Sequence, residues 1–223
     1  MSKITALRVG QGRAKRVNIF LDGKFAFSLE AEVAAKERLQ VDQALSTEQI
    51  AALTRSDQLQ RCLNVAVRYL SYRPRSEAEM RERLTHRGFA SDIQDAIINK
   101  LSEQRLVNDT AFAQFWKDNR ESFRPRSQRL TRLELKRKGI ANEIIDRVVS
   151  AIDDEASAYR AALSKVRRLS GADYPSFRRR LGGYLQRRGF SSSMIKRTLE
   201  RIWQDLERPT EIMSEPGLKE KVR

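Results

Sequence analysis

The chain has very little of what stabilises disulfide-rich, zinc-binding or membrane-spanning proteins. Its 223 residues include one cysteine, Cys62, and one histidine, His86, which exclude an internal disulfide and are too few for a structural zinc site. No run of 18 apolar residues occurs, so no transmembrane helix is expected. The first residues also lack the apolar stretch of a signal peptide. We therefore expect a cytoplasmic protein that is not inserted in a membrane and has no metal or cofactor.

Acidic residues are also scarce relative to basic ones. The chain has 44 Lys+Arg and 29 Asp+Glu, for a net charge of +15. Such an excess favours a polyanionic partner, nucleic acid first, while an anionic membrane surface or an acidic protein face stays open. Residues 155–208 contain 13 basic and 5 acidic side chains, more than half of the excess. The strongest electrostatic contact is therefore expected in this segment.

The first thirty residues differ from the rest because their pattern is typical of β-strands. Two segments rich in β-forming residues, 16–21 and 24–29, are separated by Asp22-Gly23. This dipeptide is the strongest short hairpin signal, because both central residues of a type I′ turn need a positive φ. Since an isolated hairpin is marginal in water, residues 4–9 are expected to supply a third strand. A short helix is expected over 30–38.

From Ser46 onward the apolar residues recur at helical spacing, and the chain contains an internal repeat. The sequence Tyr-Arg-Pro-Arg-Ser at 72–76 recurs 51 residues later as Phe-Arg-Pro-Arg-Ser at 123–127, and a shorter third copy begins at Tyr174. Each copy predicts a capping serine, about three helical turns, a left-handed glycine with an apolar residue after it, and a cap for the next helix. These positions are Ser76, Ser127 and Ser176; Gly88, Gly139 and Gly189; Phe89, Ile140 and Phe190; and Ser91, Asn142 and Ser192.

Each copy, with a preceding helix, predicts a three-helix unit of about fifty residues. We expect a mainly α protein, in which three tandem three-helix repeats form an elongated body after a small N-terminal β-hairpin module. The expected parts are the module with its short helix at 1–45, the three repeats at 46–107, 108–154 and 155–208, and a disordered tail at 209–223.

Several groups of cations are candidates for binding phosphate or acidic side chains, because arginine matches both with paired hydrogen bonds. The alternative is a structural role, in which these residues lie at helix starts, interact with helix dipoles or keep an exposed surface soluble. The candidates are Arg73, Arg75, Arg124 and Arg126 of the repeated motif, with Lys136, Arg137, Lys138, Arg178, Arg179, Arg180, Arg187 and Arg188.

Other residues with possible chemistry favour structural roles. Stacking on bases is a possible role for the aromatic side chains, but rings at helical spacing are more often core; they are Tyr69, Tyr72, Trp116, Phe123 and Tyr184. His86 has no nucleophile near it in sequence, and Asp153-Asp154-Glu155 is more typical of a helix start than of a Mg²⁺ site. Gly10-Gln11-Gly12 is too short for a phosphate loop. We expect no catalytic residues and no enzyme activity.

Two stretches carry a resemblance to a known family. They are Tyr-Leu-Ser-Tyr-Arg-Pro-Arg-Ser-Glu-Ala-Glu-Met-Arg-Glu-Arg-Leu at 69–84, which ends at Gly88-Phe89, and Leu-Val-Asn-Asp-Thr-Ala-Phe-Ala at 106–113. Together with Pro125 and the Glu-Leu-Lys-Arg-Lys-Gly-Ile segment at 134–140, they resemble RecX, the bacterial regulators of the RecA recombinase. The resemblance covers residues 60–205 and the hairpin at 20–29. Ser127 stands where that family often has glycine, and the third repeat is degenerate.

The resemblance implies a monomer that binds along the groove of RecA filaments on single-stranded DNA. It also implies inhibition of the RecA ATPase, strand exchange and coprotease activities, and thereby regulation of homologous recombination, DNA repair and the SOS response. Two alternatives belong to other classes. One is an independent DNA-binding protein of helix-turn-helix type. The other is an enzyme acting on nucleic acid, for which the sequence offers no convergent acid, base or metal group.

Overall fold

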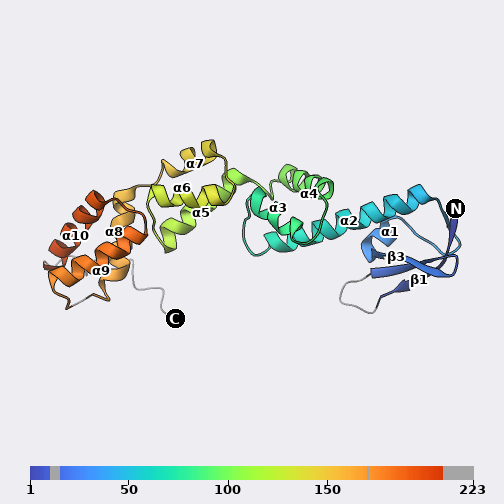
Figure 1. The fold of residues 1–223 in the computed structure, drawn as a ribbon, viewed down its shortest axis with the longest axis horizontal. Coiled ribbons are helices and arrows are strands. Elements are labelled where there is room, and N and C mark those ends of the chain that lie inside the picture. The colour runs from blue at the N-terminus through green and yellow to red at the C-terminus, as the bar shows by residue number, and fades with distance from the viewer. Residues whose placement is uncertain (11–15, 170, 208–223) are drawn as a thin grey trace. The chain divides into compact units, whose positions relative to one another are not determined.

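A computed structural model of the chain describes residues 1–10, 16–169 and 171–207. Within these ranges an antiparallel sheet precedes helices that form three-helix domains (Figure 1), which confirms the expected mainly α fold of three-helix repeats after a β module. The chain divides into two compact units, residues 1–108 and 109–223. None of the helices in the described ranges is long and apolar enough to cross a membrane. The predicted tail at 209–223 lies outside the described residues.

The N-terminal module is a sheet with the strand order β3-β2-β1-β4. Its strands are β1 (Ser2–Val9), β2 (Arg16–Leu21), β3 (Lys24–Glu30) and the short β4 (Ala44–Leu45), and helix α1 (Ala31–Lys36) follows β3. Asp22 and Gly23 have φ values of 51° and 82°, which confirms the predicted hairpin turn. The buried side chains of the module form one core: Ile4, Ile19, Leu29, Val33, Leu45 and Leu53.

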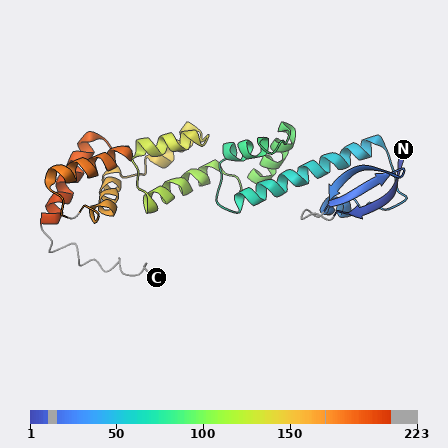
Figure 2. The same ribbon diagram turned by 60° about the horizontal axis from the view of Figure 1, so that its bottom comes forward.

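Helix α2 (Thr47–Leu70) connects this module to the first three-helix domain (Figure 2). It begins with a capping box, in which the Ser46 hydroxyl accepts from the Gln49 backbone N–H and the Gln49 side chain accepts from the Ser46 N–H. Its N-terminal half contributes Leu53 to the core of the module. Its C-terminal half contributes Cys62 and Ala66 to the core of the first domain. One helix therefore belongs to two cores.

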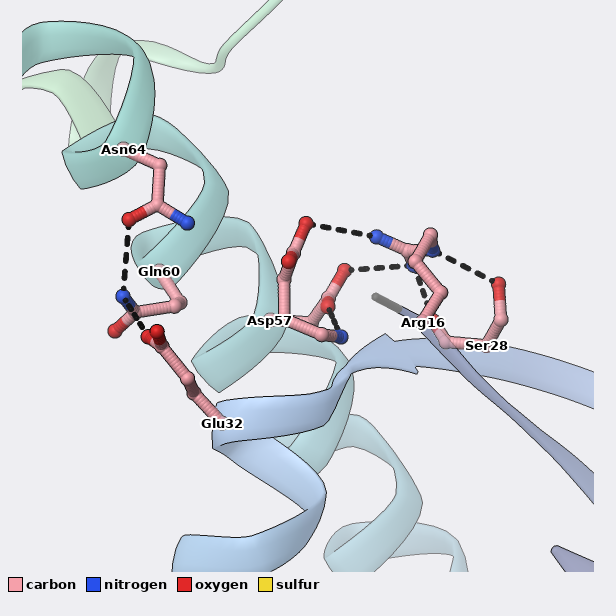
Figure 3. A network of polar contacts seen from close by, with 7 residues as sticks. Arg16, Ser28, Glu32, Asp57, Gln60 and Asn64 are labelled. Atoms are coloured by element: carbon pink, nitrogen blue, oxygen red, sulfur yellow. Dashed lines mark hydrogen bonds and ion pairs between the residues drawn. The ribbon is translucent and has the colours of Figure 1, made fainter. Parts of the chain in front are cut away.

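A polar network orients the sheet on α2 (Figure 3). The buried Asp57 carboxylate accepts from the Glu30 backbone N–H at 2.6 Å and from Arg16 Nη2 at 3.2 Å. Arg16 also donates to the Ser28 hydroxyl at 3.2 Å. Because a buried carboxylate is costly without partners, these bonds specify how the strands sit against the helix. Gln60 adds a second contact, donating to Glu32 at 2.9 Å.

The three-helix domains each surround a separate core. The first consists of α2, α3 (Glu77–Thr85) and α4 (Ser91–Glu103); the second of α5 (Asp109–Phe123), α6 (Gln128–Arg137) and α7 (Asn142–Val149); the third of α8 (Asp154–Val166), α9 (Tyr174–Arg187) and α10 (Ser192–Glu207). Their largest fully buried side chains include Met80 and Leu84, then Phe112 and Leu135, then Phe177 and Leu181.

The glycine turns that end the middle helices confirm the repeat prediction. Gly88, Gly139 and Gly189 have φ values of 79°, 75° and 87°. The next residue donates its backbone N–H to a carbonyl five residues earlier and packs against the core, as a left-handed helix end requires. These residues are Phe89, Ile140 and Phe190, and their acceptors are Leu84, Leu135 and Leu185.

The cap predictions were correct for two of the three middle helices. Ser76 and Ser127 accept from the backbone N–H three residues later. The cap predicted at Ser176 was wrong, because α9 begins earlier, after Asp173. Pro175 lies in its first turn, where the backbone N–H that proline lacks would have no partner within the helix.

The caps predicted for the last helix of each domain, Ser91, Asn142 and Ser192, were also wrong. Each of these residues is the first residue of its helix, so the cap lies one residue earlier. Ala90 and Ala141 stand at the first two caps and have no side-chain bond. At the third, the hydroxyl of Ser191 accepts from the Met194 N–H.

The second and third domains meet at a joint within residues 109–207. The Ser127 N–H donates to the Arg188 carbonyl at 3.1 Å, and Arg188 Nη1 donates to the Pro125 carbonyl at 2.9 Å. The Gln128 N–H donates to Asp154 Oδ1 at 2.7 Å. Gly189 lies against this joint, since a Cβ there would be 2.5 Å from the Ser127 hydroxyl. The glycine therefore permits both the turn and the close approach.

Candidate nucleic-acid interface

Five cations line a groove of about 450 Å³ in the third three-helix domain. We call this surface the cationic groove and define it by Lys165, Arg168, Arg179, Arg180 and Arg187. The first two come from the C-terminal end of α8 and the turn after it, and the other three from α9. Arg179, Gly183 and Arg187 are four residues apart and therefore lie on one face of α9. Gly183, between the two arginines, has no side chain to fill the groove.

A second hollow of about 330 Å³ continues from the groove. It shares Arg168 and Arg180 with the groove and adds Asp173 and Ser176. Among the residues that the structure describes, no carboxylate lies within ion-pair distance of the five groove cations. Guanidinium and ammonium groups in a concave site without carboxylate partners can donate hydrogen bonds to phosphate oxygens.

The arginines of the repeated motif are instead held inside their own domains. Arg73 makes two hydrogen bonds of 2.8 and 3.0 Å to the buried carboxylate of Glu79. The Arg75 guanidinium lies 3.9 Å from the centre of the Tyr69 ring. Burial, and then the charge of Arg73, lowers the pKa of Arg75. These contacts show that both side chains stabilise the corner between α2 and α3.

In the second copy the other arginine of the motif, the one after the proline, pairs with a carboxylate. Glu134 forms an ion pair with Arg126 and accepts from Arg120 Nε and Trp116 Nε1, both at 2.8 Å. Burial, followed by the charge of Arg120, lowers the pKa of Arg126. Arg188 is held at the joint and also lies over the Tyr184 ring. These side chains therefore have structural partners.

Three of the twelve candidate cations line the groove, which are Arg179, Arg180 and Arg187. Arg124, Lys136, Arg137 and Arg178 are exposed but do not line the groove, and Lys138 lies over the Trp116 ring. The sequence prediction missed Lys165 and Arg168, although both lie in the most basic segment. Lys165 and Arg168 are three residues apart near a helix end, and residues at this spacing lie side by side, so the sequence could have indicated a pair of cations there.

The core interpretation of the aromatic side chains is correct for some of them and wrong for others. Tyr69 and Trp116 pack against the cores of the first and second domains, and Tyr184 packs against that of the third. Tyr72 and Phe123 are 72% and 77% exposed.

Four segments of the chain match models of known protein domains. The family model of the regulatory protein RecX N-terminal domain matches residues 2–46, and those of the first, second and third RecX three-helix domains match 62–101, 108–149 and 153–199. The regulatory protein RecX of Listeria monocytogenes is 30% identical over 197 residues, which are 87% of this chain and 73% of the relative. The chain belongs to the RecX family. The RecX of Clostridium perfringens is 32% identical over 161 residues, covering 72% of this chain and 75% of that relative.

Solved RecX structures have the same fold. A crystal structure of regulatory protein RecX is 27% identical, covers 90% of this chain and 100% of the other, and superposes with a TM-score of 0.62. The crystal structure of RecX from Lactobacillus salivarius is 23% identical and covers 67% and 99%, with a TM-score of 0.56. This second likeness concerns the fold alone. Together the comparisons place the chain in a family of regulatory proteins.

Proposed function

We propose that this RecX-family chain binds the groove of RecA filaments on single-stranded DNA and inhibits the ATPase, strand-exchange and coprotease activities of RecA. It would thereby limit recombination, DNA repair and the SOS response. The single observation that carries the proposal is the cationic groove, which gathers five cations without carboxylate partners among the described residues. Membership of a family of regulatory proteins supports it.

The physical basis is attraction to the polyanion inside the filament. Phosphates and acidic side chains are both suitable partners for a concave site lined by arginine. Phosphate contacts release condensed counterions, so that part of the affinity must fall as salt rises. The excess of basic residues over 155–208 lets this domain contribute most of that attraction.

The proposal is one of regulation by binding rather than by catalysis. Within the described ranges, no three His, Cys, Asp or Glu side chains are grouped so that they could hold a metal ion. Asp153, from the acidic cluster of the sequence, caps α8 by accepting from the Glu155 and Ala156 N–H groups. We propose that the chain acts in the cytoplasm as a monomer, without a cofactor.

The test removes three groove cations together. The variant Arg179→Ala, Arg180→Ala, Arg187→Ala is compared with Arg178→Ala, Lys196→Ala, Arg197→Ala, which removes the same charge from exposed positions of the same domain outside the groove. Alanine preserves helix propensity in both. We expect only the groove variant to lose inhibition of the DNA-dependent ATPase of RecA, measured at physiological salt with circular dichroism as the folding control.

Salt dependence then identifies what the groove binds. Each phosphate contact removed should reduce the slope of log affinity against log salt by about 0.7. An unchanged slope with weaker binding would assign the groove to acidic side chains of RecA. Equal inhibition by both variants and the wild type would show that the groove is only a solvated surface. If DNA alone binds the chain as tightly as the filament does, the alternative of an independent DNA-binding protein replaces the proposal.

A further inference from the structure

Tyr72 and Phe123 occupy the same position in two successive repeats, and in both the ring faces solvent. They are 72% and 77% exposed, and each is the residue before the Arg-Pro-Arg-Ser motif. A single exposed apolar side chain is ordinary on a protein surface. Two large rings exposed at equivalent places, in domains with separate cores, indicate a feature of the repeat itself.

The corner that carries each ring is held rigidly by polar contacts. After Tyr72, Arg73 binds the buried Glu79 twice, and Ser76 caps α3. After Phe123, Arg126 pairs with Glu134. The carboxylates thus hold the backbone next to each ring from inside the domain. A ring presented by an ordered corner loses little further freedom when it binds, which favours affinity.

The third domain lacks this feature. Its equivalent ring, Tyr174, begins α9 and packs edge-on against Trp203 with the ring centres 5.0 Å apart, and lies beside Phe177. It is 37% exposed. The cationic groove lies in this same domain. The first two domains therefore present rings, and the third presents cations.

The charges beside the two rings indicate the partner. Arg68, four residues before Tyr72, is exposed, and Arg124, directly after Phe123, is exposed as well. The carboxylates of Glu79 and Glu134 are turned inward to arginines. The other nearby carboxylates, Glu77 and Glu121, each pair with a cation on their own helix. The complementary surface on a protein is a pocket that is apolar at its centre and acidic at its rim. Bases flanked by phosphates are the other possible match, and binding to DNA alone tests it. Exposed aromatic residues are also the commonest anchors of protein–protein interfaces.

We propose that Tyr72 and Phe123 are equivalent anchors, each inserting into an apolar, acid-rimmed pocket that recurs on successive subunits of a repeating protein partner. The inference rests on the proposed function, in which that partner is the RecA filament. Two rings on one chain then bind in tandem, so that the second contact forms at a high effective concentration.

The test uses the full chain with Tyr72→Ala, Phe123→Ala and the double variant. Phe25→Ala is the matched control, since that ring is 60% exposed but lies on β3. Affinity is measured for RecA filaments assembled on single-stranded DNA and for the same DNA alone. We expect each single variant to bind filaments about 10-fold more weakly and the double variant about 100-fold or more. The control and Tyr72→Phe should bind normally, and no variant should change binding to DNA alone.

Three outcomes would overturn the inference. A double variant that is folded by circular dichroism and binds filaments as the wild type does would reject the anchors while leaving the proposed function intact. An equal loss on DNA alone would show that the rings stack on bases instead. If the wild-type chain does not bind filaments, the proposed function fails and this inference fails with it.

Discussion

Replacing Gly189 with alanine should destabilise the second compact unit strongly, because two separate costs coincide at this position. Its φ of 87° is unfavourable for any residue with a Cβ, at about 1 kcal/mol. The added Cβ would lie 2.5 Å from the Ser127 hydroxyl and 2.8 Å from Leu130 Cβ. The hydroxyl cannot turn away freely, because it caps α6 through the Leu130 N–H. Overpacking of this kind costs about 1–3 kcal/mol, so the total is about 2–4 kcal/mol.

Gly171→Ala separates the two costs within the same unit. Gly171 has a φ of 81°, but a Cβ there meets nothing within 4 Å. This variant should therefore lose only about 1 kcal/mol of the free energy of unfolding. Urea titration followed by tryptophan fluorescence is a suited assay, since both tryptophans of the chain, Trp116 and Trp203, lie in this unit. Equal destabilisation by the two alanines would refute the role of Gly189 at the joint.

Three further predictions concern buried groups. Arg73→Ala removes the two hydrogen bonds that the buried Glu79 carboxylate accepts from Arg73, so the free energy of unfolding should fall by about 2–3 kcal/mol, seen as a lower melting temperature. Adding Glu79→Gln should restore part of this loss. Cys62 is fully buried with a pKa raised to about 11, so a thiol reagent at neutral pH should label it only on unfolding; fast labelling of the native chain, followed by mass spectrometry, would contradict this. Burial raises the pKa of Asp154 above 3.8, so the folded chain holds this proton more tightly, and the free energy of unfolding should decline as pH rises from 3.8 through the raised pKa. Asp154→Asn can still accept from the Gln128 N–H but does not titrate, so urea titrations across this pH range should no longer show the decline. An unchanged decline would contradict the prediction.

Features encoded by a few adjacent residues could be predicted from the sequence. The Asp22-Gly23 turn, the left-handed glycine at 139 and the Ser127 cap each depend on backbone conformations that few residue types accept. The cap at Ser176 failed because Pro175 competes for the same helix start, and proline is favoured in the first turn. Local rules therefore succeed where only a few residue types fit the backbone, and they miss by one residue where a helix begins without a capping side chain, as at Ala90 and Ala141.

Which cations line the groove could not be predicted, because it depends on ion pairs that form only in the folded chain and on helix rotation. Arg73 is neutralised by Glu79, six residues later, and Arg126 by Glu134, eight residues later. Arg178 is adjacent in sequence to Arg179, yet one residue rotates an α-helix by about 100°, which directs it away from the groove. Arg168 enters the groove from a different helix end, and only the packing of α8 against α9 reveals that.

Because α2 belongs to two cores, this one helix fixes the rotation of the N-terminal module relative to the first three-helix domain. Inserting one residue between Asp57 and Cys62 would turn one core by about 100° relative to the other and lengthen helix α2 by about 1.5 Å. Any cut that separates the module from the domain must pass through α2 and expose either the Leu53 side or the Ala66 side. A chain without the module would therefore need a new start for α2 that does not expose Leu53.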